Sequence, residues 1–125
     1  TRNKTSECIN LIIKELDDAI DALPWKWTGA DEGRFTKATV MALKGRILLY
    51  YASPQFNPEN KAERWETAYT YNKMAAEQIE ANGYGLYDSY ENIWFDEKKK
   101  GVLFVTRYQE PDITHHWDAA TRPLS

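Results

Sequence analysis

Apolar residues recur at a helical spacing in three segments of the chain, and the first runs from Ser6 to Leu23. Its isoleucines and leucines share one face of a helix, and three aspartates and a lysine lie on the opposite face. Pro24 cannot continue a helix, because its ring removes the backbone N–H group. The pattern therefore predicts an amphipathic helix over residues 6–23.

The second segment, residues 36–52, is apolar nearly all round, and Thr36 stands where a cap residue is expected. A helix without a polar face lies between neighbours and not on the surface. Glycine costs about 1 kcal/mol relative to alanine inside a helix, so Gly45 predicts a close approach by another helix. The small residues on the same side are Ala38, Ala42 and Ala52.

The third helix is predicted over residues 60–82. Asn60 followed by Glu63 has the spacing of a capping box, and Gly83 stands where a left-handed residue ends a helix. The stripe expected to be buried comprises Trp65, Ala68, Tyr69, Ala75, Ala76 and Ile79.

After Gly83 the pattern becomes aromatic and irregular. Residues 84–108 are expected to form an aromatic loop region with a short strand at Val102–Val105, and residues 109–125 a loop. Three helices joined as antiparallel neighbours predict a mainly α fold. We expect an irregular tetratricopeptide-like array with one or two short strands near the C-terminal end, although no repeat of thirty-four residues is evident.

Composition excludes several classes of function. The net charge is −3 with acids and bases interspersed, so no basic footprint for a nucleic acid is present. The single cysteine, Cys8, provides neither a disulfide nor a thiolate metal site. We expect the chain (residues 1–125) to be one fragment of a larger domain. It begins with polar residues, contains neither a signal peptide nor a membrane-spanning run, and has a predicted strand without an obvious partner.

Catalytic chemistry is not indicated. The carboxylates lie mainly on predicted solvent faces, whereas acid–base catalysis needs two groups held across a cleft. His115 and His116 are adjacent, so their side chains point in different directions, and no HExxH motif is present. No glycine-rich phosphate loop or nucleophile elbow occurs. We therefore expect a protein that is not an enzyme and that holds no metal or cofactor.

Aromatic residues make up 14% of the chain, which calls for an explanation. Trp25 and Trp27 lie in the predicted loop after the first helix, where they either form an exposed platform for sugars or, more commonly, fold back over a helix end. Near the C-terminal end, aromatic and hydrogen-bonding residues mix in a way that suits a sugar. The candidate ligand-binding residues there are Arg107, Tyr108, His115 and Trp117.

Residues from about Arg34 to Tyr108 contain a series of short motifs. A Thr-Lys pair precedes a helix rich in small residues that ends in Leu-Leu-Tyr-Tyr-Ala-Ser-Pro, followed by an aromatic-Asn turn. Downstream come a tryptophan that opens a helix, an Ala-Ala pair, Gly-Tyr-Gly-Leu-Tyr and a further Tyr and Phe. Taken in this order, the motifs resemble the central part of the SusD/RagB family. The chain departs from that family's pattern at Tyr51, Gln55 and Gly101.

The resemblance implies a lipid-anchored, mostly helical protein at the surface of the outer membrane. Such a protein binds a polysaccharide or oligosaccharide without cleaving it and works in nutrient uptake with a TonB-dependent, SusC-like transporter. The family's binding residues do not map onto this segment by motif, so the four candidates above rest on chemistry and position alone. The alternative is a purely structural helical scaffold that docks another protein. A glycan site needs an exposed Trp or Tyr on a concave, polar-rimmed surface, whereas a scaffold needs an apolar helix face.

Overall fold

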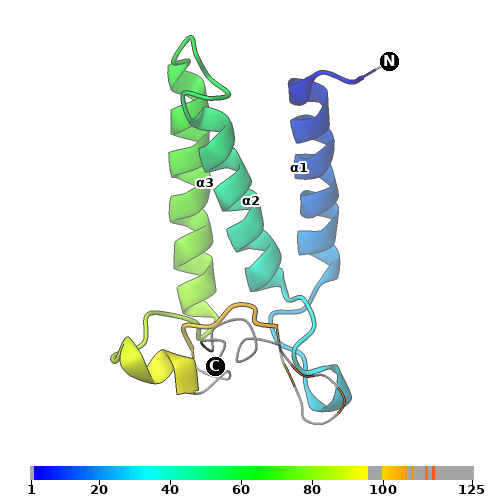
Figure 1. Ribbon diagram of the computed structural model, residues 1–125, viewed down its shortest axis with the longest axis vertical. Helices are drawn as coiled ribbons and strands as arrows, with labels where there is room; N and C mark the ends of the chain where they lie inside the picture. The colour runs from blue at the N-terminus through cyan, green and yellow to red at the C-terminus, as the bar shows by residue number, and fades with distance from the viewer. Residues whose placement is uncertain (1, 96–99, 107, 109–111, 113, 115–125) are drawn as a thin grey trace, which may run out of the picture.

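The protein is mainly α-helical, as the sequence predicts. A computed structural model describes residues 2–95, 100–106, 108, 112 and 114. Helices α1, α2 and α3 follow one another in antiparallel succession, with α2 packed against both of the others (Figure 1). The elements in chain order are α1 (Thr5–Ala22), the 3-10 turn η1 (Gly29–Asp31), α2 (Lys37–Ala52), α3 (Ala62–Ala81) and the 3-10 turn η2 (Glu91–Phe95).

Two of the predicted helix boundaries have the expected cap. The Oγ1 atom of Thr36 accepts a hydrogen bond from the backbone N–H of Thr39 at 3.3 Å, which caps α2. Gly83 has a φ of 85°, the left-handed conformation that glycine adopts most readily after a helix.

The predicted capping box of α3 is wrong, because the preceding turn is held by Asn57. This residue is buried, and its Oδ1 atom accepts a hydrogen bond from the backbone N–H of Lys61 at 2.9 Å. Its Nδ2 group donates to the carbonyls of Ala52 and Lys61 at 3.3 and 3.1 Å. Asn60 instead has a positive φ of 49° and accepts a bond from the indole of Trp65. Asn57, three residues before the expected cap residue, thus satisfies the backbone groups of the turn.

Helices α2 and α3 approach closely at Gly45, as the sequence predicts. A Cβ atom at this position would overlap the Oδ1 atom of Asn72 on α3. The Nδ2 group of Asn72 donates to the carbonyls of Gly45 and Ala68, at 3.1 and 2.8 Å. The missing side chain therefore makes room for an amide that joins the two helices.

The core is built mostly from small residues along this contact. Trp65 and Tyr69 were expected to be buried, but 38% and 68% of their surfaces are exposed, and Ala76 is exposed as well. Within the described residues, α3 packs on α2 alone, so only a narrow stripe is covered and the bulky side chains lie outside it. The buried apolar residues are Ala38, Val40, Met41, Ala52, Ala68 and Ala75.

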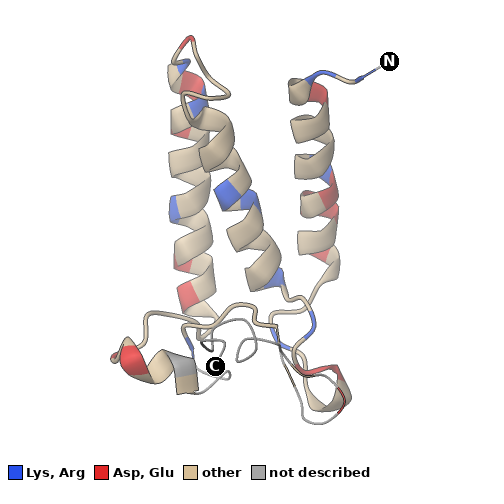
Figure 2. Cartoon of the chain, viewed as in Figure 1, with Lys and Arg blue, Asp and Glu red and all other residues tan. Residues whose placement is uncertain are grey.

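An ion pair between Lys44 and Asp17 joins α1 to α2. Lys44 is buried, and its Nζ atom lies 4.6 Å from the centre of the Tyr71 ring. Burial of the ring, with the negative charge of Asp17 as a smaller contribution, raises the pKa of Tyr71 to about 12. The pair belongs to a wider charge pattern, since acids lie along α1 and bases along α2 (Figure 2).

The predicted strand at Val102–Val105 does not form, and no strand occurs in the part of the chain that the structure describes. A strand needs a neighbour whose backbone completes its hydrogen bonds. The carbonyl of Leu103 instead accepts a bond from the Oγ1 atom of Thr39 on α2, at 2.8 Å. The apolar run packs across the start of α2 as an irregular segment.

We expect Gly45→Ala to lower the free energy of unfolding by about 1–3 kcal/mol. The new methyl group displaces the Asn72 amide, which makes two hydrogen bonds. In an Asn72→Ala background the same substitution should stabilise the protein by up to about 1 kcal/mol, since only helix propensity remains. Urea denaturation of the four variants measures both values. Equal effects in the two backgrounds would contradict the close contact.

We expect Tyr71→Phe to leave the stability at pH 7 within about 0.5 kcal/mol, because within the described residues the buried hydroxyl has no hydrogen-bond partner. The pKa is raised from 10.0, so neutral Tyr71 contributes stability that is full below pH 10 and is lost as the pH rises through about 12. Denaturation between pH 8 and pH 12 should show a smaller alkaline loss in Tyr71→Phe. The exposed Tyr69→Phe, on the same helix, is the control and should match the wild type.

Candidate ligand-binding cleft

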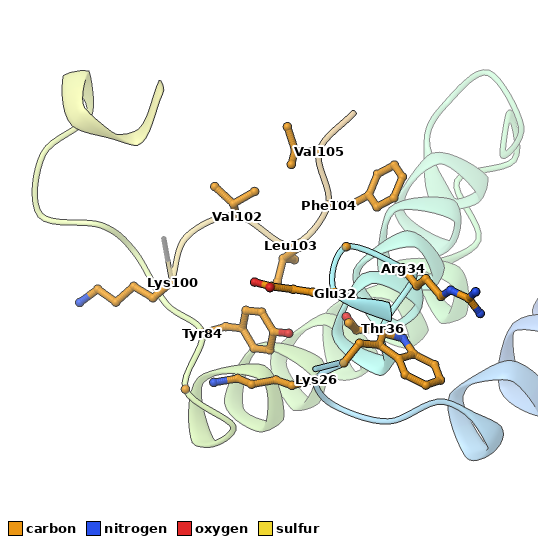
Figure 3. A pocket seen from close by; sticks show the side chains of 13 residues that line it. Lys26, Glu32, Arg34, Thr36, Tyr84, Lys100, Val102, Leu103, Phe104 and Val105 are labelled. Carbon is orange, nitrogen blue, oxygen red and sulfur yellow. The ribbon is translucent and has the colours of Figure 1, made fainter. Parts of the chain in front are cut away.

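A cleft of about 300 Å³ lies where the α1–α2 connection meets the chain that follows α3 (Figure 3). Its walls come from residues 26–36 on one side and from residues 83–84 and 100–105 on the other. The volume is at the lower end of the range for small-molecule pockets, about 300–1,000 Å³. The segments that line the cleft are distant in the sequence, and Figure 1 shows them near one another at the lower end of the helices.

Tyr84 ties the two walls together. It follows the left-handed Gly83 at the end of α3, and its hydroxyl donates a hydrogen bond to the carbonyl of Trp25 at 2.8 Å. The Nζ atom of Lys26 lies 5.6 Å from the centre of the Tyr84 ring, within the range of a cation–π contact. In the view of Figure 3 the ring lies between the side chains of Lys26 and Glu32. The tyrosine is thus fixed at both ends and presents its ring to the cleft.

The two loop tryptophans have different surroundings. The indole N–H of Trp27 donates to the carbonyl of Phe35 at 2.8 Å, which folds the loop back toward α2 while the half-buried ring lines the cleft. Trp25 does not line the cleft, and the Nζ atom of Lys37 lies 5.7 Å from its ring centre. The loop therefore contributes one aromatic side chain to the cleft.

The far wall of the cleft, the segment 100–106, is held by two contacts with α2 and its approach. The rings of Phe35 and Phe104 stack with centroids 4.5 Å apart and planes 10° from parallel. One turn into α2, the Thr39 hydroxyl bonds to the Leu103 carbonyl. The backbone N–H of Gly85 also donates to the carbonyl of Lys100 at 3.0 Å.

Charges of both signs surround the cleft. Lys26, Arg34 and Lys100 line it together with Glu32. Two of the bases have acidic neighbours outside the lining: Arg34 pairs with Asp31 at 3.0 Å, and Lys100 lies 3.8 Å from Asp88. Donors, an acceptor carboxylate and aromatic faces thus converge on a site with little excess charge.

The sequence-based candidates are not the residues that form this cleft. Arg107, His115 and Trp117 lie outside the described residues, and Tyr108 is half exposed and does not line the cleft. The sequence named Trp25 and Trp27 together as a possible sugar platform while favouring a fold back over a helix end, and Tyr84, Lys26 and Glu32 were missed as site residues. An aromatic residue directly after a helix-ending glycine was the available signal, whereas the approach of residues 26–36 to it is a long-range contact without a local pattern.

Comparison with protein-family models, with curated proteins and with solved structures gives no match for this chain. In the described residues there is no group of three or more His, Cys, Asp or Glu side chains placed to hold a metal ion. None of the helices found there combines the length and the hydropathy that crossing a bilayer requires.

We expect Phe35→Ala to loosen the far wall of the cleft, because it removes the stack with Phe104. A stacked pair is worth about 0.5–1.5 kcal/mol, so amide exchange in the peptide spanning residues 100–106 should speed up by about 2- to 10-fold. Hydrogen-exchange mass spectrometry measures this rate. Phe56→Ala, at the opposite end of α2, is the matched control. An unchanged rate in Phe35→Ala would show that the stack does not hold the segment.

Proposed function

We propose that the protein binds a glycan in the cleft between residues 26–36 and the chain after α3, without cleaving it. The observation that carries the proposal is a concave, polar-rimmed surface lined by Trp27 and Tyr84. A sugar ring packs its C–H face on an aromatic ring while its hydroxyls need donors and acceptors. Lys26, Glu32 and Thr36 supply both kinds of group at the same cleft.

The wider role comes from the resemblance to the SusD/RagB family. Its motif residues include Thr36 and Tyr84, which line the cleft, and Asn57, which holds the α2–α3 turn. On this basis we propose that the protein acts at the surface of the outer membrane in nutrient uptake. Its partner would be a TonB-dependent, SusC-like transporter, and a lipid would anchor it to the membrane.

We expect one member of a panel of plant, host and microbial oligosaccharides to give a saturable response in calorimetry and tryptophan fluorescence. Tyr84→Ala should raise the dissociation constant by about tenfold or more. It removes an aromatic ring whose contact with the sugar contributes at least about 1.4 kcal/mol to the binding free energy. Lys26→Met and Glu32→Gln, which keep the shape of the cleft, should each weaken binding by a smaller factor.

Trp65→Ala is the matched control, because Trp65 lies at the start of α3, away from the cleft, and bonds to Asn60. Its affinity should equal that of the wild type. A folded chain that responds to no glycan in the panel would refute the proposal. Binding that survives Tyr84→Ala and both cleft variants would place the glycan elsewhere on the protein.

A second candidate function, a scaffold that docks a protein, is favoured by one specific observation. α2 keeps an apolar face that neither α1 nor α3 covers, with Leu43 and Tyr50 each about half exposed. Such a face is typical of an interaction surface. The two functions use different parts of the molecule and are compatible.

A further inference from the structure

A groove runs along the uncovered face of α2. One hollow of about 350 Å³ lies between α1 and α2 and is lined by residues from Ile9 to Phe56. A second, of about 660 Å³, lies between the first half of α2 and the segment 101–105. Leu43 and Arg46 line both hollows, so the two lie next to each other on this face of α2; together they are called here the α2 groove. A groove of this kind accepts the apolar face of a helix.

Arg46 is the charged residue that lines the α2 groove in the described part of the chain. It is exposed, and its guanidinium lies 5.6 Å from the centre of the Tyr50 ring, with no carboxylate among the described residues paired to it. Lys44, on the face toward α1, already pairs with Asp17. The occupant that fits the groove is therefore an apolar helix face with a carboxylate about midway along it.

α1 has such a face on its exposed side. Leu11 and Ile12 are 58% and 41% exposed, and the exposed Glu15 follows one turn later; these three residues are called here the α1 ridge. Helix α1 carries five acids and one base, whereas α2 carries three bases and no acid (Figure 2). On the two surfaces themselves, Glu15 of the ridge and Arg46 of the groove carry opposite charges beside apolar side chains.

The α1 ridge and the α2 groove adjoin each other on one molecule, because Ile9 lines the groove and Ile12 follows it by one helical turn. A ridge cannot enter the groove that its own helix borders. Two copies facing each other about a twofold axis can place each ridge in the other's groove, and such an interface closes on itself. In such a dimer both ridges and both grooves are occupied.

We propose that this face joins two copies of the chain in a symmetric dimer, with the α1 ridge of each copy in the α2 groove of the other. Glu15 of one copy pairs with Arg46 of the second. The contact covers the half-exposed Leu43 and Tyr50 and gives α2 a third helical neighbour. Residues 102–105 line both the α2 groove and the far wall of the glycan cleft, whereas Leu43, Arg46 and Tyr50 line the groove alone.

Sedimentation velocity of the full chain over a range of concentrations tests the dimer directly. The wild type should dimerise, and Arg46→Glu and Glu15→Arg should each raise the dissociation constant by about tenfold or more, because each places like charges opposite each other. The double variant Glu15→Arg/Arg46→Glu restores opposite charges with exchanged positions. It should recover most of the wild-type affinity.

Lys73→Glu and Glu77→Arg make the same charge changes on the exposed side of α3 and should leave the dissociation constant unchanged. Both Glu15 and Arg46 are exposed, so melting temperatures close to that of the wild type are expected for all variants. A wild-type chain that stays monomeric at every concentration overturns the proposal. So does a dimer that the single variants leave intact or that the double variant fails to restore.

Discussion

Helices α2 and α3 can lie close together only because Gly45 has no side chain, and the rest of the structure depends on this contact. The space is filled by the amide of Asn72, which bonds to a carbonyl on each helix. Small residues extend the contact in both directions, so the two helices lie along each other over their length. Few large apolar side chains are buried between the helices. The hydrogen bonds of Asn72 therefore contribute more than usual to fixing the register of α2 against α3.

That alignment determines where the connecting segments meet. Antiparallel packing brings the start of α2 next to the end of α3, and the residues on either side of these two points become the walls of the cleft. Tyr84 and the stack between Phe35 and Phe104 then join segments that the helices have already brought together. The same packing leaves part of α2 uncovered. Its contact with α3 is narrow, and α1 covers a second side, so an apolar face remains for a further neighbour.

The features that could be predicted from the sequence are those with local causes. Helical periodicity located all three helices, Thr36 and Gly83 marked two of their ends, and the cost of glycine in a helix pointed to the close contact at Gly45. Other predictions were wrong. The strand at 102–105 lacks a neighbour within the described residues, and Asn57 takes the role expected of Asn60. The cleft is made by long-range contacts and was therefore missed. Three of the four candidate ligand residues lie outside the described residues, and the fourth, Tyr108, does not line the cleft.

The hydrogen bonds of Asn57 bear on the order in which the helices pair during folding. One buried side chain bonds to the carbonyl of Ala52 at the end of α2 and to both backbone groups of Lys61 just before α3. The two helices are close in sequence, so little loop entropy is lost when they pair, and contacts of this kind form early in folding. Helix α1 is joined to α2 by a longer connection and by the ion pair between Asp17 and Lys44. That ion pair needs Lys44 to be positioned on a folded α2. We therefore expect the hairpin of α2 and α3 to form first and to be the surface on which α1 docks.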